Sequence, residues 1–408
     1  MYNKKIIVIL LTALLLLSCS AKSGLDIATK NGFPMLKGKA VGVVANHTAK
    51  NADGEHIVDL MHDSGIKIQA IFGPEHGFRG IEEAGELVKD NIDIKTGAPI
   101  YSLYGKISKP TPELLKGVDV LVFDIQDIGA RFYTYISTMG RIMEAGAENN
   151  IPVYIFDRPN PIGRIAEGPI IEQEFYSGVG KYPIPIRHGL TVGELALMIK
   201  DKGWIESADK LDLTIVECKA WDPDKPYKAA KQSWINPSPN IRNINEALVY
   251  PGTCLFEATN FSEGRGSEKP FEWVGAPYVD SKELVAELKK RNIAGVEIEE
   301  VDFTPTCPPD AYYKPKYNDI PCHGVALTVT DPVNFKAVEF GIHFIDVLKD
   351  LYPDKFVITR PLWMHKLWGN KNAYDMFEAN KSADEIIATY KQELAKFVEI
   401  REEYLLYR

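Results

Sequence analysis

Short apolar runs along the chain alternate with segments whose apolar residues recur every three or four positions. The runs are rich in β-branched residues and predict buried strands, at 39–46, 66–73, 118–127, 151–161 and 211–218. The intervening segments predict amphipathic helices, at 55–65, 133–150 and 191–204. Continuous apolar strands alternating with such helices are typical of a parallel sheet covered on both faces. We therefore predict an α/β fold, with a Rossmann-like, doubly wound, mostly parallel sheet.

The pattern changes at about Tyr250. A Gly- and Glu-rich segment, 258–278, is followed by shorter strand patterns and by long helical patterns that reach the end of the chain. This order of elements favours a second, smaller α+β domain. The predicted organisation is a signal segment over 1–19, a Rossmann-like domain over 24–250 and a smaller C-terminal domain over 251–408 that completes a cleft.

The N-terminus has the layout of a secretory signal. Two lysines precede an apolar run from Ile6 to Leu17, which is too short to span a bilayer comfortably, and Ser18 and Cys19 follow. The letters "LLSC" resemble a bacterial lipobox, after which Cys19 would be lipidated. We expect an exported lipoprotein, anchored by that lipid in the periplasm, at the outer membrane or at the cell surface. The alternative is a cleaved signal with an incidental cysteine.

Composition and charge exclude several classes of protein. The 408 residues are 45% hydrophobic and 25% charged, with a net charge of -9, and no run of Lys and Arg could neutralise a nucleic-acid backbone. Neither common phosphate-binding glycine loop occurs, nor does the G-x-S-x-G motif of the α/β-hydrolases. The eight histidines are dispersed, without an H-x-x-x-H or H-x-H pair. We expect no nucleic-acid partner, no cofactor and no metal.

The cysteines beyond Cys19 form no Cys-x-x-Cys pair, which argues against a zinc site or a disulfide framework. Cys307 and Cys322 could form a bridge in an oxidising compartment. Buried free thiols are an equally good interpretation.

Polar residues gather where the predicted strands end. They are Asn46 and His47, Glu75 and His76, Asp124, Asp127 and Arg131, and Asp157, Arg158 and Asn160. Ligands of open parallel sheets bind outside the carboxyl ends of the strands, so these side chains predict a cleft lined by carboxylates, amides and arginines.

That set of groups suits the hydrolysis of a glycosidic bond, in which one carboxylic acid protonates the leaving oxygen and a second group assists. Glu75 lies beside His76 in "GPEHG", where partial burial would raise its pKa into the range of a general acid. Structural alternatives remain. Glu75 could cap a helix or pair with Arg79, and Asp127 could pair with Arg131. Asp157 before "RPNP" is a natural turn residue.

Several motifs together resemble those of a known family. "IFGPEHGFRG", "VLVFDIQDIGARFYTYISTM", "RHGLTVGELA", "NPSPNIRN" and "EATNFSEGRGSEKPFEWVGAPY" occur in the order found in the exo-β-N-acetylmuramidases, a glycoside hydrolase family first described as a domain of unknown function. The resemblance covers nearly the whole chain after the signal segment. It implies a Rossmann-like domain, a smaller C-terminal domain and a cleft between them. The implied activity is removal of β-1,4-linked N-acetylmuramic acid from the non-reducing end of peptidoglycan fragments.

The resemblance also implies roles for residues. Glu75 becomes the first candidate for the catalytic acid, with His76 beside it, and Arg131 and Arg265 become candidates for binding the lactyl carboxylate. Asp127 is the preferred second group, with Glu263 behind it, and Tyr101 or Tyr104 could supply a hydroxyl instead. The predicted substrate-binding residues are Asn46, Arg79, Tyr104, Arg131, Asp157, Asn160, His188, Asn240, Asn260, Glu263 and Arg265. Arg164 and Ser267 depart from the glycine and threonine expected at their positions, and neither removes a proposed catalytic group.

The sequence leaves mechanism and class open. Retaining, inverting and substrate-assisted hydrolysis all fit these residues. A non-catalytic surface lipoprotein that captures cell-wall sugars, or a metal-dependent amidase or deacetylase, are the alternative functions.

Overall fold

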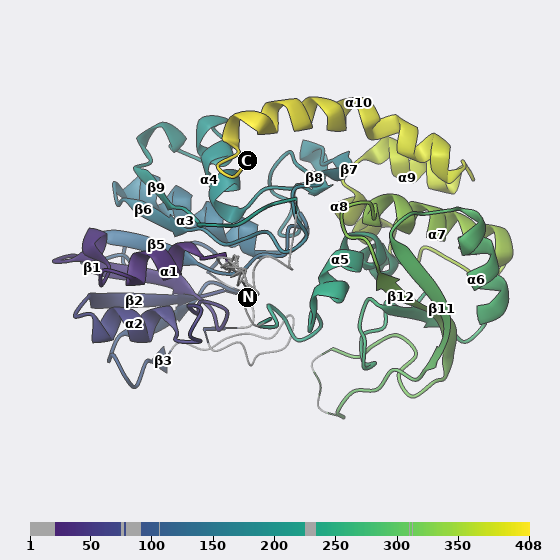
Figure 1. Cartoon of the computed structure of the whole chain (residues 1–408), viewed down its shortest axis with the longest axis horizontal. Coiled ribbons are helices and arrows are strands. Elements are labelled where there is room, and N and C mark those ends of the chain that lie inside the picture. Colours follow the sequence, from purple (N-terminus) through teal and green to yellow (C-terminus); the bar gives the residue numbers. More distant parts are fainter. Residues whose placement is uncertain are drawn as a thin grey trace, which may run out of the picture.

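The computed structural model describes residues 21–74, 77–78, 91–105, 107–224, 234–309, 311 and 313–408. These residues form two bodies, each built around its own sheet, and one long C-terminal helix runs over both of them (Figure 1). The first body carries the parallel sheet predicted from the sequence.

The sheet of the first body joins seven strands of the described chain in the order β3-β4-β2-β1-β5-β6-β9. Its strands are β1 Ala40–Ala45, β2 Lys67–Gly73, β3 Asn91–Ile92, β4 Pro99–Ser102, β5 Val120–Asp124, β6 Val153–Phe156 and β9 Leu213–Val216. All neighbours pair in parallel except β3, which runs antiparallel to β4 at the edge. The remaining six strands have the order of a Rossmann fold, so the predicted fold class is confirmed.

Helices cover both faces of this sheet. Alternate residues of the same strand enter different clusters: Val43 and Val122 pack with α1 (Gly24–Thr29) and α2 (Ile57–Asp63). Val44 and Phe123 pack on the other face with α3 (Tyr135–Asn149) and α4 (Val192–Asp201). Because strand side chains alternate between faces, this explains why the strands read as unbroken apolar runs.

The second body is a three-stranded antiparallel sheet with helices packed against it. Its strands are β10 Trp273–Ala276, β11 Val296–Phe303 and β12 Cys322–Val329, in the order β10-β12-β11. Its helices are α5 Ile244–Thr253, α6 Ser281–Lys290, α7 Ala337–Leu351, α8 Pro361–Trp368 and α9 Lys371–Glu378. The composition change at Tyr250 had suggested a boundary there, and that position lies inside α5.

Helix α5 packs closely on α7 because glycines meet where the two helices cross. A Cβ atom on Gly252 would lie 2.0 Å from the carbonyl oxygen of Ala337 and 3.2 Å from the amide of Gly341. A side chain at Gly252 would therefore push the helices apart. Tyr250 in α5 and Cys254 directly after it therefore belong to the second body.

The end of the chain returns to the first body. Helix α10 (Ala383–Arg401) passes over both bodies (Figure 1), and Arg401 donates from Nη1 to the carbonyl of Arg164 at 2.5 Å. Helix α10 also contacts β7 (Glu167–Ile170), which pairs with β8 (Pro185–Arg187). Short 3-10 helices complete the described elements, at Pro34–Leu36, Gln173–Phe175, Ala208–Lys210, Cys254–Ala258 and Glu402–Tyr404.

Candidate active site

The sheet has its switch point between β1 and β5, which are adjacent and parallel. From β1 the chain builds outward through β2 and β4, and it then crosses back to build β5, β6 and β9 on the other side. The loops leaving neighbouring strands diverge at such a point and form the crevice in which ligands of this fold bind. Asn46 and Asp127 follow the two central strands, so the predicted polar residues lie in the right region of the fold.

Many of these residues are nevertheless occupied by bonds within the protein. Asp157 is fully buried and accepts from the amides of Arg158 and Gly193, at 2.9 and 2.8 Å, and from the hydroxyls of Thr191 and Tyr407, at 2.7 and 2.6 Å. Burial raises the pKa of Asp157 to about 6, and these hydrogen bonds oppose the shift. Asp157 therefore ties α4 and the C-terminal residues to the end of β6.

The bonds of Asn46 and Asn160 are also internal. Asn46 Oδ1 accepts from the amide and the hydroxyl of Thr48, at 2.9 and 2.6 Å. Asn160 donates to the carbonyl of Leu190 at 3.0 Å and accepts from the amide of Ile162 at 3.1 Å. Both side chains shape turns at the sheet edge, and Asn46 Nδ2 is buried without a partner among the described residues.

A buried ion pair joins the ends of β5 and β6. Arg158 donates from Nε and Nη2 to the two carboxylate oxygens of Asp124, at 2.5 and 2.9 Å. Both side chains are at least 96% buried, so the bidentate geometry must replace the water that each charge loses. The pair fixes two loops of the crevice relative to each other.

Asp127 and His188 face each other at the same edge. Asp127 Oδ2 accepts from the amide of Gly129 at 2.6 Å and lies 3.9 Å from His188 Nε2. Asp127 Oδ1 and His188 Nε2 are buried and have no hydrogen-bond partner in the described part of the chain. Burial raises the pKa of Asp127 to about 7 and lowers that of His188 to about 3, with Arg401 and Arg131 adding to the second shift. The imidazole is therefore neutral at pH 7, and the carboxyl group is poised between its two forms.

Arg131 is buried and links the two bodies through hydrogen bonds. Its Nη1 donates to the carbonyls of Pro169 and Ile184, at 2.8 and 3.0 Å, and its Nη2 donates to those of Leu367 and Trp368, at 2.7 and 2.9 Å. Burial lowers its pKa to about 9. Because four carbonyls occupy both terminal nitrogens, these contacts argue against the carboxylate-binding role predicted for Arg131.

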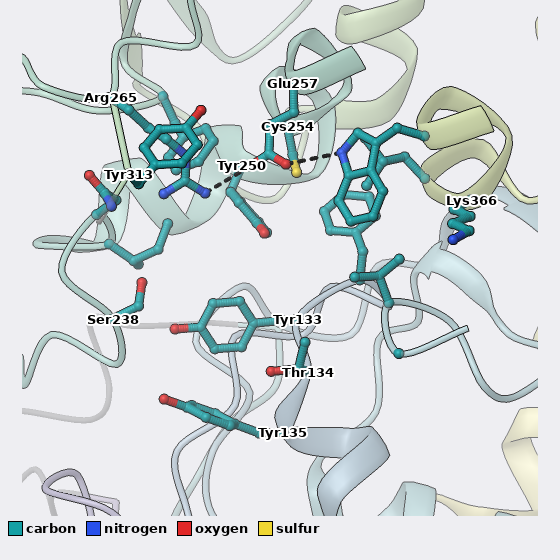
Figure 2. Close-up of a pocket in the computed structure, with 18 of the residues that line it drawn as sticks. Tyr133, Thr134, Tyr135, Ser238, Tyr250, Cys254, Glu257, Arg265, Tyr313 and Lys366 are labelled. Atoms are coloured by element: carbon teal, nitrogen blue, oxygen red, sulfur yellow. Dashed lines mark hydrogen bonds and ion pairs between the residues drawn. The ribbon is translucent and has the colours of Figure 1, made fainter. Parts of the chain in front are cut away.

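A cavity of about 570 Å³ opens between the two bodies, within the usual size range of ligand sites (Figure 2). The first body contributes residues from the segment after β5 and from two other segments: Tyr104, Phe132, Tyr133, Thr134, Tyr135, Ser177, Gly178 and Val179. The second body contributes residues from α5, α8 and the loops around them, including Ser238, Asn240, Tyr250, Cys254, Glu257, Arg265, Phe271, Tyr313, Arg360, Trp363 and Lys366. Tyrosine rings from both sides thus face one space.

Arg265 lies in the wall of this cavity, held by acids and aromatic rings. Its Nη2 donates to Glu257 Oε1 at 2.7 Å, and its Nε lies 3.5 Å from Glu263 Oε1. The guanidinium also lies over the rings of Phe271 and Tyr313, at 5.1 and 5.6 Å from their centroids. Burial alone would disfavour its charge, but Glu257 and Glu263 raise its pKa above the ordinary value. Arg265 is therefore a cation whose charge is already balanced.

The remaining predicted residues divide between the cavity and the protein interior. Tyr104 and Asn240 line the cavity. Glu263 is buried behind Arg265 and accepts from Lys316 Nζ at 2.7 Å; burial opposes ionisation, but Lys316 and Arg265 lower its pKa. Asn260 bonds to the backbone of Lys355 and Val357, at 2.7 and 2.9 Å, which braces the loop before α8.

Four predictions fall outside the described residues. They concern Glu75, His76, Arg79 and the lipidated Cys19. Close to them, the structure describes Gly77, whose amide donates to the carbonyl of Pro74 at 2.9 Å, directly after the end of β2. The role of Glu75 as the acid thus remains a prediction from the sequence.

Sequence reasoning missed most of the C-terminal wall. The sequence analysis did not predict a role for Glu257 or Tyr313, nor for Arg360, Trp363 and Lys366 at the start of α8 and within it, although all five line the cavity. The three-residue spacing of Arg360, Trp363 and Lys366 in "RPLWMHKLW" was the only available signal, because it places them on one helical face.

No group of three or more His, Cys, Asp or Glu among the described residues could hold a metal ion. Cys218, Cys254, Cys307 and Cys322 are free thiols, so the alternative of a Cys307–Cys322 bridge is not realised. None of the helices described here has the length and apolar character needed to cross a membrane.

Comparison with known families gives two matches that together span most of the chain. The model of the N-terminal domain of the exo-β-N-acetylmuramidase NamZ matches residues 41–245, and that of its C-terminal domain matches residues 248–407. The chain is also 44% identical to a peptidoglycan β-N-acetylmuramidase NamZ of Bacillus subtilis (strain 168), over 388 residues that cover 95% of this chain and 91% of that protein.

Two solved structures share the fold. Both are DUF1343 family proteins from Bacteroides fragilis NCTC 9343, and each match covers 95% of this chain and 99% of the other. One has a TM-score of 0.87 at 32% identity, and the other has a TM-score of 0.75 at 36% identity.

Proposed function

Because the chain belongs to the exo-β-N-acetylmuramidase NamZ family, we propose that it hydrolyses the β-1,4 bond of N-acetylmuramic acid at the non-reducing end of peptidoglycan fragments. The observation that carries this proposal is the cavity between the two bodies, which takes part of its wall from the loop after β5 and is lined by tyrosines and cations. Aromatic rings pack on the apolar faces of sugars while their hydroxyls bond to sugar oxygens, and cations bind the carboxylate of the lactyl group.

The proposed chemistry needs an acid and a second group. Glu75, directly after Pro74 at the end of β2, donates a proton to the leaving glycosidic oxygen. Asp127 is the preferred partner because it has one oxygen free of described partners and a pKa raised to about 7 by burial. In a retaining enzyme the two carboxyl groups would be about 5 Å apart, and in an inverting enzyme roughly 6.5 to 9.5 Å apart. In a substrate-assisted reaction the 2-acetamido oxygen replaces the second carboxylate.

The test is to incubate residues 20–408 with MurNAc-β-1,4-GlcNAc and to follow free N-acetylmuramic acid and the anomer first released. The Glu75→Gln variant should fold normally and lose several orders of magnitude in turnover. Glu399→Gln, which changes an exposed carboxylate of α10, is the matched control and should match the wild type.

The results separate the possible functions. Release by wild type and by Glu399→Gln, but not by Glu75→Gln, supports the muramidase and the acid role, and the anomer separates retention from inversion. Tight disaccharide binding without release would favour a sugar-capturing protein. Activity that chelators abolish would favour a metal-dependent amidase or deacetylase.

We also propose that the protein is exported and anchored by a lipid on Cys19. The support is the charged and then apolar N-terminal segment with its lipobox-like "LLSC". Cys19→Ala should move the protein from the membrane fraction to the soluble fraction, whereas Cys307→Ala should leave it with the membranes. Membrane association of Cys19→Ala would refute the anchor.

A further inference from the structure

Helix α8 directs one face into the cavity. Arg360, which precedes its first residue, Trp363 and Lys366 all line the cavity and are spaced three positions apart. Side chains at this spacing lie on the same side of a helix. In Figure 2, Lys366 lies on the opposite side of the view from Arg265 and Tyr313.

The positive charges on this face are not balanced. Within the described residues, neither the Arg360 nor the Lys366 side chain has a hydrogen bond or an ion pair with a carboxylate. Arg265 differs, because Glu257 and Glu263 flank it. Among the described residues that line this cavity, the positive charge without a carboxylate partner therefore lies on Arg360 and Lys366.

The face is also partly organised before any ligand binds. The Arg360 guanidinium lies 5.0 Å from the ring centroid of Trp363, and Trp363 Nε1 donates to Glu257 Oε2 at 3.2 Å. A helix rises about 1.5 Å per residue, so residues 360 and 366 are about 9 Å apart along α8, a distance that their long side chains can bridge. One anionic group can thus meet both cations beside a fixed indole ring.

Resting on the proposed function, we propose that Arg360 and Lys366 bind the lactyl carboxylate of the substrate and that Trp363 packs against the sugar ring beside it. N-acetylmuramic acid differs from N-acetylglucosamine by this one anionic substituent. The α8 face therefore selects the anionic sugar, a role that the sequence had suggested for Arg131 and Arg265. Those two guanidinium groups instead hold the cavity walls, through four carbonyls and two carboxylates respectively.

The experiment compares two substrates that differ only in charge: MurNAc-β-1,4-GlcNAc and the methyl ester of its lactyl group. In the Arg360→Gln/Lys366→Gln double variant, KM for the acid should rise about ten-fold or more, while kcat stays within about three-fold. KM for the ester should not change, because the ester carries no charge to lose. Lys366→Arg in the wild-type background should retain the wild-type KM for the acid.

The matched control is Lys371→Gln, an exposed lysine at the start of α9 that does not line the cavity. It should leave KM for both substrates unchanged. Equal losses on acid and ester, or no loss on either, would overturn the proposal. So would an acid-specific loss in Arg265→Gln that the double variant lacks.

A failure of the proposed function would look different. If the wild-type protein releases nothing from either substrate, the proposed muramidase activity is refuted, but binding of the sugars can still be tested. Calorimetry with free N-acetylmuramic acid and N-acetylglucosamine should then show binding of the acid that the double variant loses. Equal binding of both sugars by wild type would reject the α8 face as a carboxylate site.

Discussion

The carboxyl edge of the sheet and the cavity between the two bodies use similar residues in opposite ways. At the sheet edge, Asp124 is paired with Arg158, and Asp157 accepts four hydrogen bonds. In the cavity, Arg360 and Lys366 face open space, and no carboxylate of the described residues pairs with them. Buried polar groups are almost always satisfied within the protein, so the groups left open are those available to a ligand. Substitutions of edge residues whose bonds are all internal, such as Asp157, should therefore change stability, and substitutions of the open groups in the cavity should change KM.

The largest effect is expected from Asp157→Ala. The change leaves four donors without their acceptor, including the Thr191 and Tyr407 hydroxyls, so the free energy of unfolding should fall by about 3–5 kcal/mol. Denaturant unfolding measures the loss. Asp119→Ala, which removes one bond to the amide of Ala40, should cost only about 1 kcal/mol. A larger KM in the protein that remains folded would place Asp157 in the substrate site and contradict the comparison.

A smaller loss is expected from Arg131→Lys. Lysine keeps a positive charge but offers three donors from one atom, whereas Arg131 serves four carbonyls from two nitrogens. We expect the free energy of unfolding to fall by about 2–3 kcal/mol, measured by denaturant titration. If Arg131 bound the substrate carboxylate instead, the variant would raise KM for the acid substrate and leave KM for its methyl ester unchanged.

Asp127→Asn tests the buried Asp127 and His188 at the sheet edge through the pH dependence of stability. The folded pKa of Asp127 is raised to about 7 and the unfolded value is about 3.9, so the folded state holds the extra proton between these values. Stability from this group is complete below about pH 4 and is lost as pH rises to about 7, by at most about 1.4 kcal/mol per pH unit. The stability of wild type relative to Asp127→Asn should therefore fall from pH 5 to pH 7.

His188→Gln is the control, because its effect on stability should change with pH in the opposite direction. The pKa of His188 is lowered to about 3, so wild type should gain stability relative to His188→Gln as pH rises from about 3 to 6.5. Chemical denaturation at several pH values measures both differences. A flat difference for Asp127→Asn would mean that the carboxyl group is ionised in the folded protein throughout this range.

The contrast also explains how far the sequence could lead. Unbroken apolar runs such as Val41–Val44 predicted the parallel sheet, because burial on both faces leaves that pattern. The position of Asp127 just beyond the end of a strand followed from the same reasoning. The sequence could not show which polar groups remain open to a ligand. For example, the partners of Arg131 include the carbonyls of Leu367 and Trp368, which are more than 230 positions away in the chain. Backbone carbonyls leave no mark in the residue pattern.

The smallest effect is expected at Tyr135, which belongs to both regions. Tyr135 is the first residue of α3, is 1% exposed and lines the cavity, and its hydroxyl donates to the carbonyl of Pro237 at 2.7 Å. Tyr135→Phe removes that bond, so the free energy of unfolding should fall by about 1 kcal/mol. Pro237 precedes Ser238 in the opposite wall, so KM should also rise about two-fold as that wall loosens, with kcat unchanged. Tyr176→Phe, at a more exposed tyrosine outside the cavity lining, should change neither quantity. A change in stability without any change in KM would show that the two regions are separate even where one side chain joins them.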